Sequence, residues 1–481
     1  MYSWDLVFPP VIPNKELYEP TFELDDPNDP ANWNIPRKLM NAVVCWCCCA
    51  TVYWTTSIYV ADVSFIESTF VLGVEPASLG VSLHVLGLGL GSLFWIRPSD
   101  IFGRKNILIL SIFISTGLSF GSSTSDTFTT LAFCRLCAGF AEAAALCILP
   151  VSCHEMMGSR NIGAILSVYF FSCAVGLYLP TVVGEHILAS GLSPVWMLHS
   201  GGIALGGLLL LLLFAFRESN RQSLLRDKAE MLRWETGNWA IHVPVEHDDF
   251  AFDMHLIFCI CNSLRTVLSR KRPCFIAVYW GSTVAASFML LNVLPVVFKG
   301  YSFDDQSSGL PFIGLVVGSN VSAVVCSLMR EPFNPALNAA SGRASLRHLL
   351  TIISFSGMII AIGILLLFCA GAYPRGTEFP GGAHWMIPVI GVFLFGFGQH
   401  MMTFSSFAYV CNFATLADAL ASCMSMAMFL AFPVPLFTLV MVGSVGIFWA
   451  GVLLGSILLL EFAVTIVLLV YPMKKFQVSP E

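Results

Sequence analysis

Apolar residues gather along this chain in runs long enough to cross a lipid bilayer as helices. About 20 apolar residues are needed, because each helical residue advances about 1.5 Å through a hydrocarbon layer about 30 Å thick. Six such runs precede a long polar stretch, and six more follow it. The predicted spans are residues 40–61, 77–96, 106–122, 128–151, 162–188, 195–216, 273–298, 309–329, 348–372, 384–411, 415–441 and 445–471. This pattern predicts an all-α membrane protein with twelve transmembrane helices.

The distribution of lysine and arginine tests this count independently. Short cytoplasmic loops of membrane proteins carry an excess of these residues. If the N-terminus is cytoplasmic, all 24 cations fall on the cytoplasmic side except Lys299, Arg375 and the intramembrane Arg135. A wrong helix count would have destroyed this asymmetry. We therefore expect both termini and the central loop to be cytoplasmic.

Six helices, a loop and six helices form the layout of transporters that are built from two similar halves around a midplane site. This layout argues against a seven-helix receptor, and against a simple channel, which commonly assembles from several shorter chains. The expected segments are an N-terminal tail (1–39), a six-helix bundle (40–216), a central loop (217–272), a second six-helix bundle (273–471) and a C-terminal tail (472–481).

Composition supports a membrane protein and excludes several other classes. Of the 481 residues 56% are hydrophobic and only 11% are charged, whereas a soluble domain carries about 25% charged residues. The net charge of −6 and the lack of a basic domain argue against nucleic-acid binding. Residues 1–39 are acidic and proline-rich, so no signal peptide is expected. The 16 cysteines lie mostly in apolar runs, and we expect them to pack as small hydrophobes without disulfides or a metal.

Five motifs carry a resemblance to a known family. They are DPNDPANWNIPRK before the first span, SDIFGRK after the second, CRLCAGF in the fourth, ESNRQSLLRDKAEMLRWETG after the sixth, and LPVVFKGYSFDDQSSGLPF between the seventh and eighth. In this order they resemble the major facilitator superfamily, specifically its fungal twelve-helix drug:proton antiporter branch. The resemblance implies two pseudo-symmetric six-helix bundles that work by alternating access.

The charged break RPSDIFGRKN (97–106) matches the family's signature loop. The resemblance implies that its carboxylate pairs with basic residues and a helix end across the interface between the halves, and so holds the cytoplasmic side shut. Asp100, Gly103, Arg104 and Lys105 fall on that pattern. Glycine permits a tight reversal, and a carboxylate near a helix N-terminus is stabilised by the helix dipole. The two cations also suit a purely topological role at a membrane edge, and the two roles are compatible.

Two ionisable residues of the fourth span are candidates for proton coupling. A charge at mid-bilayer costs at least about 2.5–3.5 kcal/mol on insertion scales, so each needs a reason. Arg135 corresponds to the Arg-x-x-x-Gly of the family, which implies a role in coupling; the alternative is a structural bond to backbone carbonyls. Glu142 lies two turns further on the same face and is a candidate proton carrier. Its alternative is a permanently protonated group bonded to a neighbouring helix.

Other intramembrane groups are weaker candidates. Glu461 and the four histidines 84, 186, 199 and 400 suit structural roles, and Asp418 suits an interfacial position. Asp62, Glu67 and Glu75 are expected in a solvated first outer loop.

The fifth span keeps part of the glycine–proline pattern of the antiporter branch. Gly176, Pro180 and Gly184 recur at four-residue spacing, which favours close helix packing and antiport over uptake. The tenth and eleventh spans have lost polar residues of the branch, which favours an apolar central cavity. From the tenth span we expect Trp385, Gln399, His400 and Tyr409 among its lining residues.

The combined interpretation is a proton-coupled exporter of a small, largely apolar organic compound. No phosphate-binding Gly-Lys-Ser/Thr motif, nucleophile–base set or cofactor motif is present, so neither ATP-driven transport nor an enzyme is expected. Residues 252–273 read as an amphipathic helix on the cytoplasmic leaflet. We expect a monomer in the plasma membrane. The alternatives are an uptake permease, and a sensor that keeps the fold but does not transport.

Overall fold

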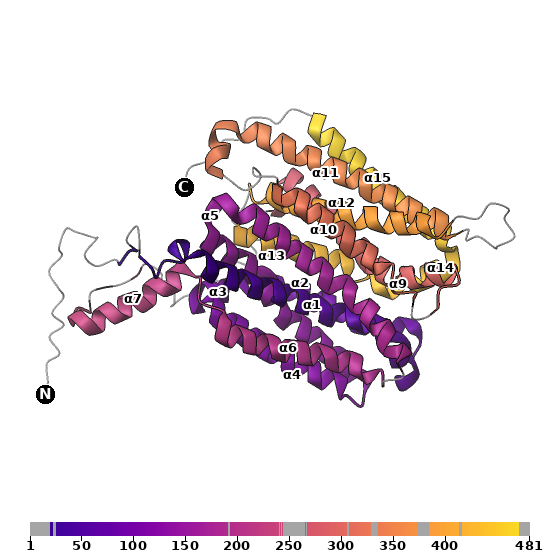
Figure 1. Cartoon of the computed structure of the whole chain (residues 1–481), viewed down its shortest axis with the longest axis horizontal. Helices are drawn as coiled ribbons and strands as arrows, with labels where there is room; N and C mark the ends of the chain where they lie inside the picture. Colours follow the sequence, from indigo (N-terminus) through magenta and orange to yellow (C-terminus); the bar gives the residue numbers. More distant parts are fainter. Residues whose placement is uncertain are drawn as a thin grey trace.

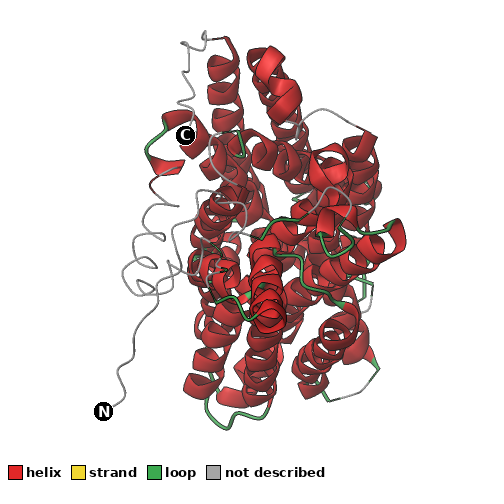
Figure 2. Cartoon of the chain, turned by 90° about the vertical axis from the view of Figure 1, so that its left-hand side faces the viewer, coloured by secondary structure: helices red, strands yellow, loops and turns green. Residues whose placement is uncertain are grey.

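The computed structural model describes residues 20–22, 26–190, 193–239, 241, 243, 265, 267–304, 307–328, 335–372, 384–412 and 416–470. Side chains at 158–162, 188–189 and 335–345 are outside this description. All the regular structure in these ranges is helical (Figure 2). The predicted amphipathic helix at 252–273 lies mostly outside the described residues.

The predicted spans of the first half correspond to five helices. They are α1 (Ile35–Phe70), α2 (Val74–Phe94), α4 (Arg104–Ser123), α5 (Phe128–Ala189) and α6 (Val195–Ala215). Helix α5 is 62 residues long and contains two candidate spans, Phe128–Met157 and Gly163–Ile187. The Tyr169 hydroxyl donates to the Leu146 carbonyl at 2.7 Å, although 23 residues of straight helix would separate them by about 35 Å. The chain therefore reverses within α5, and its two parts cross the bundle in opposite directions.

The second half has the same number of spans. They are α9 (Lys271–Lys299), α10 (Phe312–Leu328), α11 (Pro335–Gly371), α12 (Met386–Val410), α13 (Leu416–Ala431) followed by α14 (Val434–Val445), and α15 (Ile447–Val470). Helices α13 and α14 together form one candidate span, broken next to Pro433. Eleven candidate spans among the described residues are long enough to cross a membrane, and α10 adds a shorter apolar helix of 17 residues. The described helices correspond in number to the twelve predicted spans, and the predicted all-α fold class is confirmed.

The two halves form two bundles that pack side by side. In Figure 1 helices α1 to α6, indigo to magenta, occupy the lower part of the molecule and helices α9 to α15, orange to yellow, the upper part. Helix α2 packs on α13 and α14, and α5 packs on α10 and α12. The hydroxyl of Ser425 bonds the Gly89 carbonyl (2.9 Å), and that of Ser167 bonds the Ala323 carbonyl (2.9 Å), so backbone carbonyls of each half accept bonds from the other.

Glycines allow the helices of the first half to pack at backbone distance. A Cβ built on Gly87 of α2 would lie 2.7 Å from the Phe140 amide nitrogen of α5, and one on Gly184 would lie 2.6 Å from the Ala61 Cβ of α1. A Cβ on Gly176 would collide with the Ala50 carbonyl of α1. In a membrane, where hydrophobic burial gives little drive for helix association, such close packing is the main source of stability.

Helix α1 extends well beyond the predicted span, and this corrects one prediction. Asp62 lies within α1 and is completely buried, rather than in a solvated outer loop. Its two carboxylate oxygens have no hydrogen-bond partner among the described residues. Glu67 also lies in α1, and Glu75 lies in the first turn of α2. The predicted first span ended at residue 61 because Asp62 is charged. The sequence does not reveal that the helix continues and that neighbouring helices cover Asp62.

Two short helices lie where polar segments leave the first bundle. Helix α3 (Ile96–Phe102) follows α2, and α7 (Arg221–Thr236) follows α6 and projects from the bundle at the left of Figure 1. The N-terminal segment binds α7 through the pairs Asp26–Lys228 (2.8 Å) and Asp29–Arg221 (2.9 Å). The hydrogen bond from Lys228 lowers the pKa of Asp26. The lysine and arginine of these pairs are partly exposed, so water and salt screen both interactions.

Replacing Gly176 by alanine should destabilise the protein by about 1–3 kcal/mol, because the added methyl meets backbone that cannot rotate away. The measurement is the midpoint of thermal unfolding of the purified protein in detergent. Gly207→Ala on α6 is the matched control, because a Cβ there has nothing within 4 Å and helix propensity improves. Equal midpoints for the two variants would contradict the packing described here.

Candidate functional site

A buried carboxylate lies at the junction of three helices in the first bundle. Glu142 is followed in α5 by three alanines, so neighbouring helices can approach closely at this turn, and its side chain is completely buried. Its Oε2 accepts a hydrogen bond from Thr55 of α1 (2.5 Å), and its Oε1 accepts one from Ser115 of α4 (2.6 Å). Hydroxyl groups that donate to a carboxylate reduce the cost of burying it.

Arg135 lies two turns before Glu142 on α5 and is linked to it through α1. Its Nη1 donates to the Thr55 carbonyl (2.9 Å), and its Nε donates to the Gly80 carbonyl of α2 at 3.5 Å. The guanidinium also lies 4.8 Å from the centre of the Tyr59 ring. Thr55 therefore bonds Arg135 through its backbone and Glu142 through its side chain. Thr55 thus joins Arg135 to Glu142.

His84 provides a second link between the same two residues. Its Nδ1 lies 3.1 Å from the Arg135 carbonyl, and its Nε2 lies 3.4 Å from the Glu142 Oε2. The imidazole is completely buried. In the sequence His84 is a weaker candidate, because a single histidine in a membrane span more often has a structural role, and the sequence does not show that α2 places it beside Glu142. Glu142, His84, Arg135 and Thr55 are called the interior polar cluster below.

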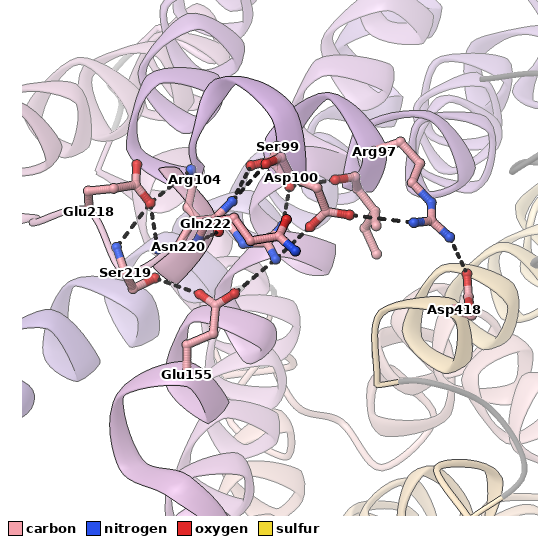
Figure 3. A network of polar contacts seen from close by, with 11 residues as sticks. Arg97, Ser99, Asp100, Arg104, Glu155, Glu218, Ser219, Asn220, Gln222 and Asp418 are labelled. Carbon is pink, nitrogen blue, oxygen red and sulfur yellow. Dashed lines mark hydrogen bonds and ion pairs between the residues drawn. The ribbon is translucent and has the colours of Figure 1, made fainter. Parts of the chain in front are cut away.

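The charged break after α2 forms a second network (Figure 3). The Arg104 guanidinium is only 4% exposed and pairs with Asp100 at 2.7 Å and with Glu155 of α5 at 3.0 Å. Its Nη1 also donates to the Ser99 hydroxyl (2.5 Å). The second oxygen of Glu155 accepts a bond from Ser219 (3.0 Å). Asp100 and Arg104 therefore come together as predicted, and Glu155 joins them.

The carboxylate at the helix end in this network is Glu218, not Asp100. Its oxygens accept bonds from the backbone amides of Arg104 (3.0 Å) and Lys105 (2.9 Å), the first residues of α4. A carboxylate at that position is stabilised by the unpaired amides and the helix dipole. Gly103 has φ +88°, and a Cβ on it would lie 2.7 Å from the Glu218 Oε2. Glycine is therefore required there for both conformation and space.

Contact with the second bundle is made by Arg97 rather than by Asp100. Arg97 lies 3.8 Å from Asp100 and 3.5 Å from Asp418, in the first turn of α13 (Figure 3). Its side chain is 37% exposed, so this pair is much weaker than the buried one around Arg104. The resemblance implied that Asp100 contacts the other half of the protein, whereas in the structure Arg97 makes this contact. Asp418 is thus more than an interfacial residue.

A small cavity of about 50 Å³ lies between the two bundles. Both bundles line it, with α1 and α5 on one side and α9, α10, α12 and α13 on the other. The lining residues are Tyr53, Phe170, Cys173, Ala174, Leu177, Tyr178, Trp280, Val284, Ser319, Gln399, His400, Thr403 and Met424. None of them carries a carboxylate or a lysine or arginine. The cavity is far smaller than the roughly 300–1,000 Å³ of sites that hold drug-sized ligands.

Polar groups of the cavity bridge the two bundles. The Tyr178 hydroxyl of α5 donates to the Gln399 Oε1 of α12 (2.6 Å), and the Gln399 amide donates to Ser287 of α9. His400 lies 3.0 Å from the Ser167 carbonyl of α5 through its Nε2. Gln399 and His400 thus line the cavity, whereas Tyr409 is buried elsewhere and Trp385, 42% exposed, contacts Phe303.

The remaining predicted residues have packing positions. Gly176 and Gly184 face α1, and Pro180 lies inside α5. Glu461 accepts a bond from Ser282 of α9 (2.6 Å), and His186 and His199 bond carbonyls of their own helices. Lys105 bonds the Leu213 carbonyl at the end of α6 (3.3 Å). The roles of these residues in transport stay predictions.

The family model of the Major Facilitator Superfamily matches residues 45–434 of this chain. The chain belongs to the major facilitator superfamily. It is 28% identical over 472 residues to a Candida glabrata protein named multidrug transporter TPO1_2, with 96% of this chain and 80% of the relative covered. It is 24% identical over 451 residues to the Saccharomyces cerevisiae protein named probable drug/proton antiporter YHK8, with 92% and 86% covered.

A solved structure supports the same fold. The structure of the proton:xylose symporter XylE superposes with a TM-score of 0.61 at 16% identity, covering 91% of this chain and 97% of the other. Membership of this superfamily of transporters confirms the predicted class of a multi-pass membrane transporter rather than an enzyme. It also confirms the two-bundle fold around a central cavity that the motifs implied.

Arg104→Gln should destabilise this transporter by up to about 3 kcal/mol, whereas Arg97→Gln should cost less than about 1 kcal/mol. Breaking a fully buried pair costs about 3–5 kcal/mol, and the carboxylates around Arg104 are partly exposed, which lowers that figure. Thermal midpoints of the two variants, measured side by side in detergent, test the difference. A larger loss for Arg97→Gln would show that the contact between the bundles, not the buried network, holds this end together.

Proposed function

We propose that this protein is a secondary active transporter that exports a small, uncharged and largely apolar organic compound in exchange for protons. The observation that carries the proposal is a buried carboxylate, Glu142, held by hydroxyls and linked to Arg135, inside a major facilitator fold whose central cavity has aromatic and uncharged walls. The names of two relatives, multidrug transporter TPO1_2 and probable drug/proton antiporter YHK8, support export of this kind.

In this mechanism the cavity between the bundles alternately opens to each side of the membrane. The cavity of about 50 Å³ is smaller than a drug-sized substrate, so the bundles must move apart to admit one. Contacts between the bundles occur at both ends, Arg97 with Asp418 at one and Glu185 beside Gly309 at the other. Opening the first end breaks this partly exposed ion pair, at a cost of about 0–1 kcal/mol, and also separates α13 from α2, including the Ser425–Gly89 hydrogen bond. The buried network around Arg104 would remain intact.

We further propose the membrane placement and segment limits that the cation distribution indicates. Both termini and the end that carries α3 and α7 would be cytoplasmic, in the plasma membrane, with the protein acting as a monomer. The segments would be the tails 1–39 and 472–481, the bundles 40–216 and 273–471, and the central loop 217–272. Substrate would enter from the cytoplasm or the inner leaflet, and protons would return through the interior polar cluster.

Cells that express the protein should accumulate less of the uncharged dye Nile red than cells without it. Collapse of the proton gradient with a protonophore should raise accumulation only in the expressing cells, because the gradient drives export. Cell fluorescence measures both effects. Higher accumulation in expressing cells would instead indicate an uptake permease, and equal accumulation under both conditions would count against export of such compounds.

Glu142→Gln should abolish gradient-driven Nile red transport in proteoliposomes, because an amide cannot take up and release a proton. Exchange of dye across the membrane without a pH gradient should persist, and the remaining transport should not depend on pH. Glu461→Gln is the matched control, because Glu461 of α15 bonds Ser282 of α9 and does not belong to the interior polar cluster. Normal gradient-driven transport in Glu142→Gln would remove this residue from the coupling mechanism.

A further inference from the structure

The geometry of His84 shows which of its nitrogens carries a proton. A carbonyl oxygen only accepts hydrogen bonds, so the 3.1 Å contact with the Arg135 carbonyl requires a proton on Nδ1. In the neutral imidazole the other nitrogen, Nε2, then has a lone pair and no proton. This nitrogen faces Glu142 Oε2 at 3.4 Å, and it has no other hydrogen-bond partner among the described residues.

A lone pair on His84 Nε2 therefore faces a lone pair on Glu142 Oε2, unless the two side chains share one proton in addition to the proton on Nδ1. With that proton on Oε2, a neutral carboxyl faces a neutral imidazole; with it on Nε2, an imidazolium faces a carboxylate. Both arrangements are attractive, whereas the fully deprotonated pair places an anionic oxygen against a lone pair in a site without water contact. The pair is thus built to hold one proton rather than none or two.

Thr55 suits both protonation states of Glu142. Its Oγ1 lies 2.5 Å from Glu142 Oε2 and 2.7 Å from its own helix carbonyl at Val52. A hydroxyl has one proton and two lone pairs. When Glu142 is charged, Thr55 donates to it; when Oε2 carries the proton and donates it to His84, Thr55 keeps a partner by donating to the Val52 carbonyl. Proton uptake therefore leaves no buried polar group without a partner at this contact.

Packing of α2 against α5 positions the imidazole. A Cβ on Gly139 would collide with the His84 carbonyl, so the two backbones are in contact at this turn. The charged group nearest the pair is Arg135 of α5, whose guanidinium lies over the Tyr59 ring of α1, and α4 contributes the Ser115 hydroxyl. From the second bundle, α13 packs on α2 through Ser425, and its Asp418 lies at the other end beside Arg97.

We propose that His84 and Glu142 form one proton-binding unit, in which a single coupling proton is shared between Nε2 and Oε2. This inference rests on the proposed function and extends it, since it adds a second residue to the proton site. The proton moves between a nitrogen lone pair and a carboxylate oxygen, and no other reactant is required. Arg135 keeps the imidazole oriented through its backbone carbonyl, which makes it a positioning residue for this unit.

The first test measures protonation directly and does not depend on transport. The protonated-carboxyl band of Glu142, identified by its absence in Glu142→Gln, is followed by infrared spectroscopy of the purified protein as a function of pH. In His84→Asn the amide can still donate to the Arg135 carbonyl but cannot take a proton, so the midpoint of this band should move by about one pH unit or more. His199→Asn, whose histidine bonds its own helix at Val195, should keep the wild-type midpoint.

An unchanged midpoint in His84→Asn, or an equal shift in His199→Asn, overturns the proposal. If His84→Asn does not yield folded protein, His84→Gln provides the same loss of basicity with a longer amide. A wild-type midpoint in His84→Gln also overturns the proposal.

The second test uses gradient-driven Nile red transport in proteoliposomes. His84→Asn should lose gradient-driven transport while keeping exchange without a gradient, and His84→Asn/Glu142→Gln should be no worse than Glu142→Gln alone, because the two residues act as a unit. Wild-type coupling in His84→Asn, or additive losses in the double variant, contradicts a shared proton. If the wild-type protein does not move Nile red, the proposed function fails for this dye, and the infrared midpoint still decides the role of His84.

Discussion

Lipid offers no hydrogen bonds, and this constraint shapes the whole molecule. Every backbone amide in the membrane must be bonded within the chain, so the regular structure of the described residues is helical throughout. Ionisable side chains must find partners inside the bundles for the same reason. Arg135 bonds backbone carbonyls of α1 and α2, and Glu142 bonds hydroxyls of α1 and α4. Asp62 is the exception, since both of its buried oxygens lack a hydrogen-bond partner among the described residues.

The two charged networks at the α3 end differ in strength, and the difference matches what each must do. Arg104 is buried and binds Asp100 and Glu155, and Glu218 caps α4 beside it. All of these residues belong to the first half of the chain, so the network makes that half rigid. The contact to the second half is the half-exposed Arg97–Asp418 pair. If the bundles separate at this end during transport, as proposed above, the partly exposed pair breaks at less cost than the buried network.

The intramembrane polar groups are concentrated in the first bundle, while the cavity between the bundles is uncharged. Helix α1 connects the two regions. Thr55 belongs to the interior polar cluster, and Tyr53, two residues before it, lines the cavity. The Ser57 hydroxyl of the same helix bonds the Gly176 carbonyl of α5, close to the cavity residue Leu177. A change in the bonding of Glu142 therefore acts on a helix that also forms part of the cavity wall, which is the physical connection that coupling requires.

The sequence by itself determined the helices and their number, because span length and the positions of cations follow directly from the thickness and polarity of a bilayer. Its five motifs carried the resemblance to the family. It also singled out Arg135, Glu142 and the loop from Asp100 to Lys105, since charge in an apolar segment is costly wherever it points. Only the tertiary structure decided their partners. His84, Thr55, Ser115, Glu155 and Glu218 are ordinary residues in the sequence, and they become significant because separate helices bring them within hydrogen-bond distance. A period of 3.6 residues places side chains on a face of one helix, but which helix covers that face depends on packing between segments far apart in the chain.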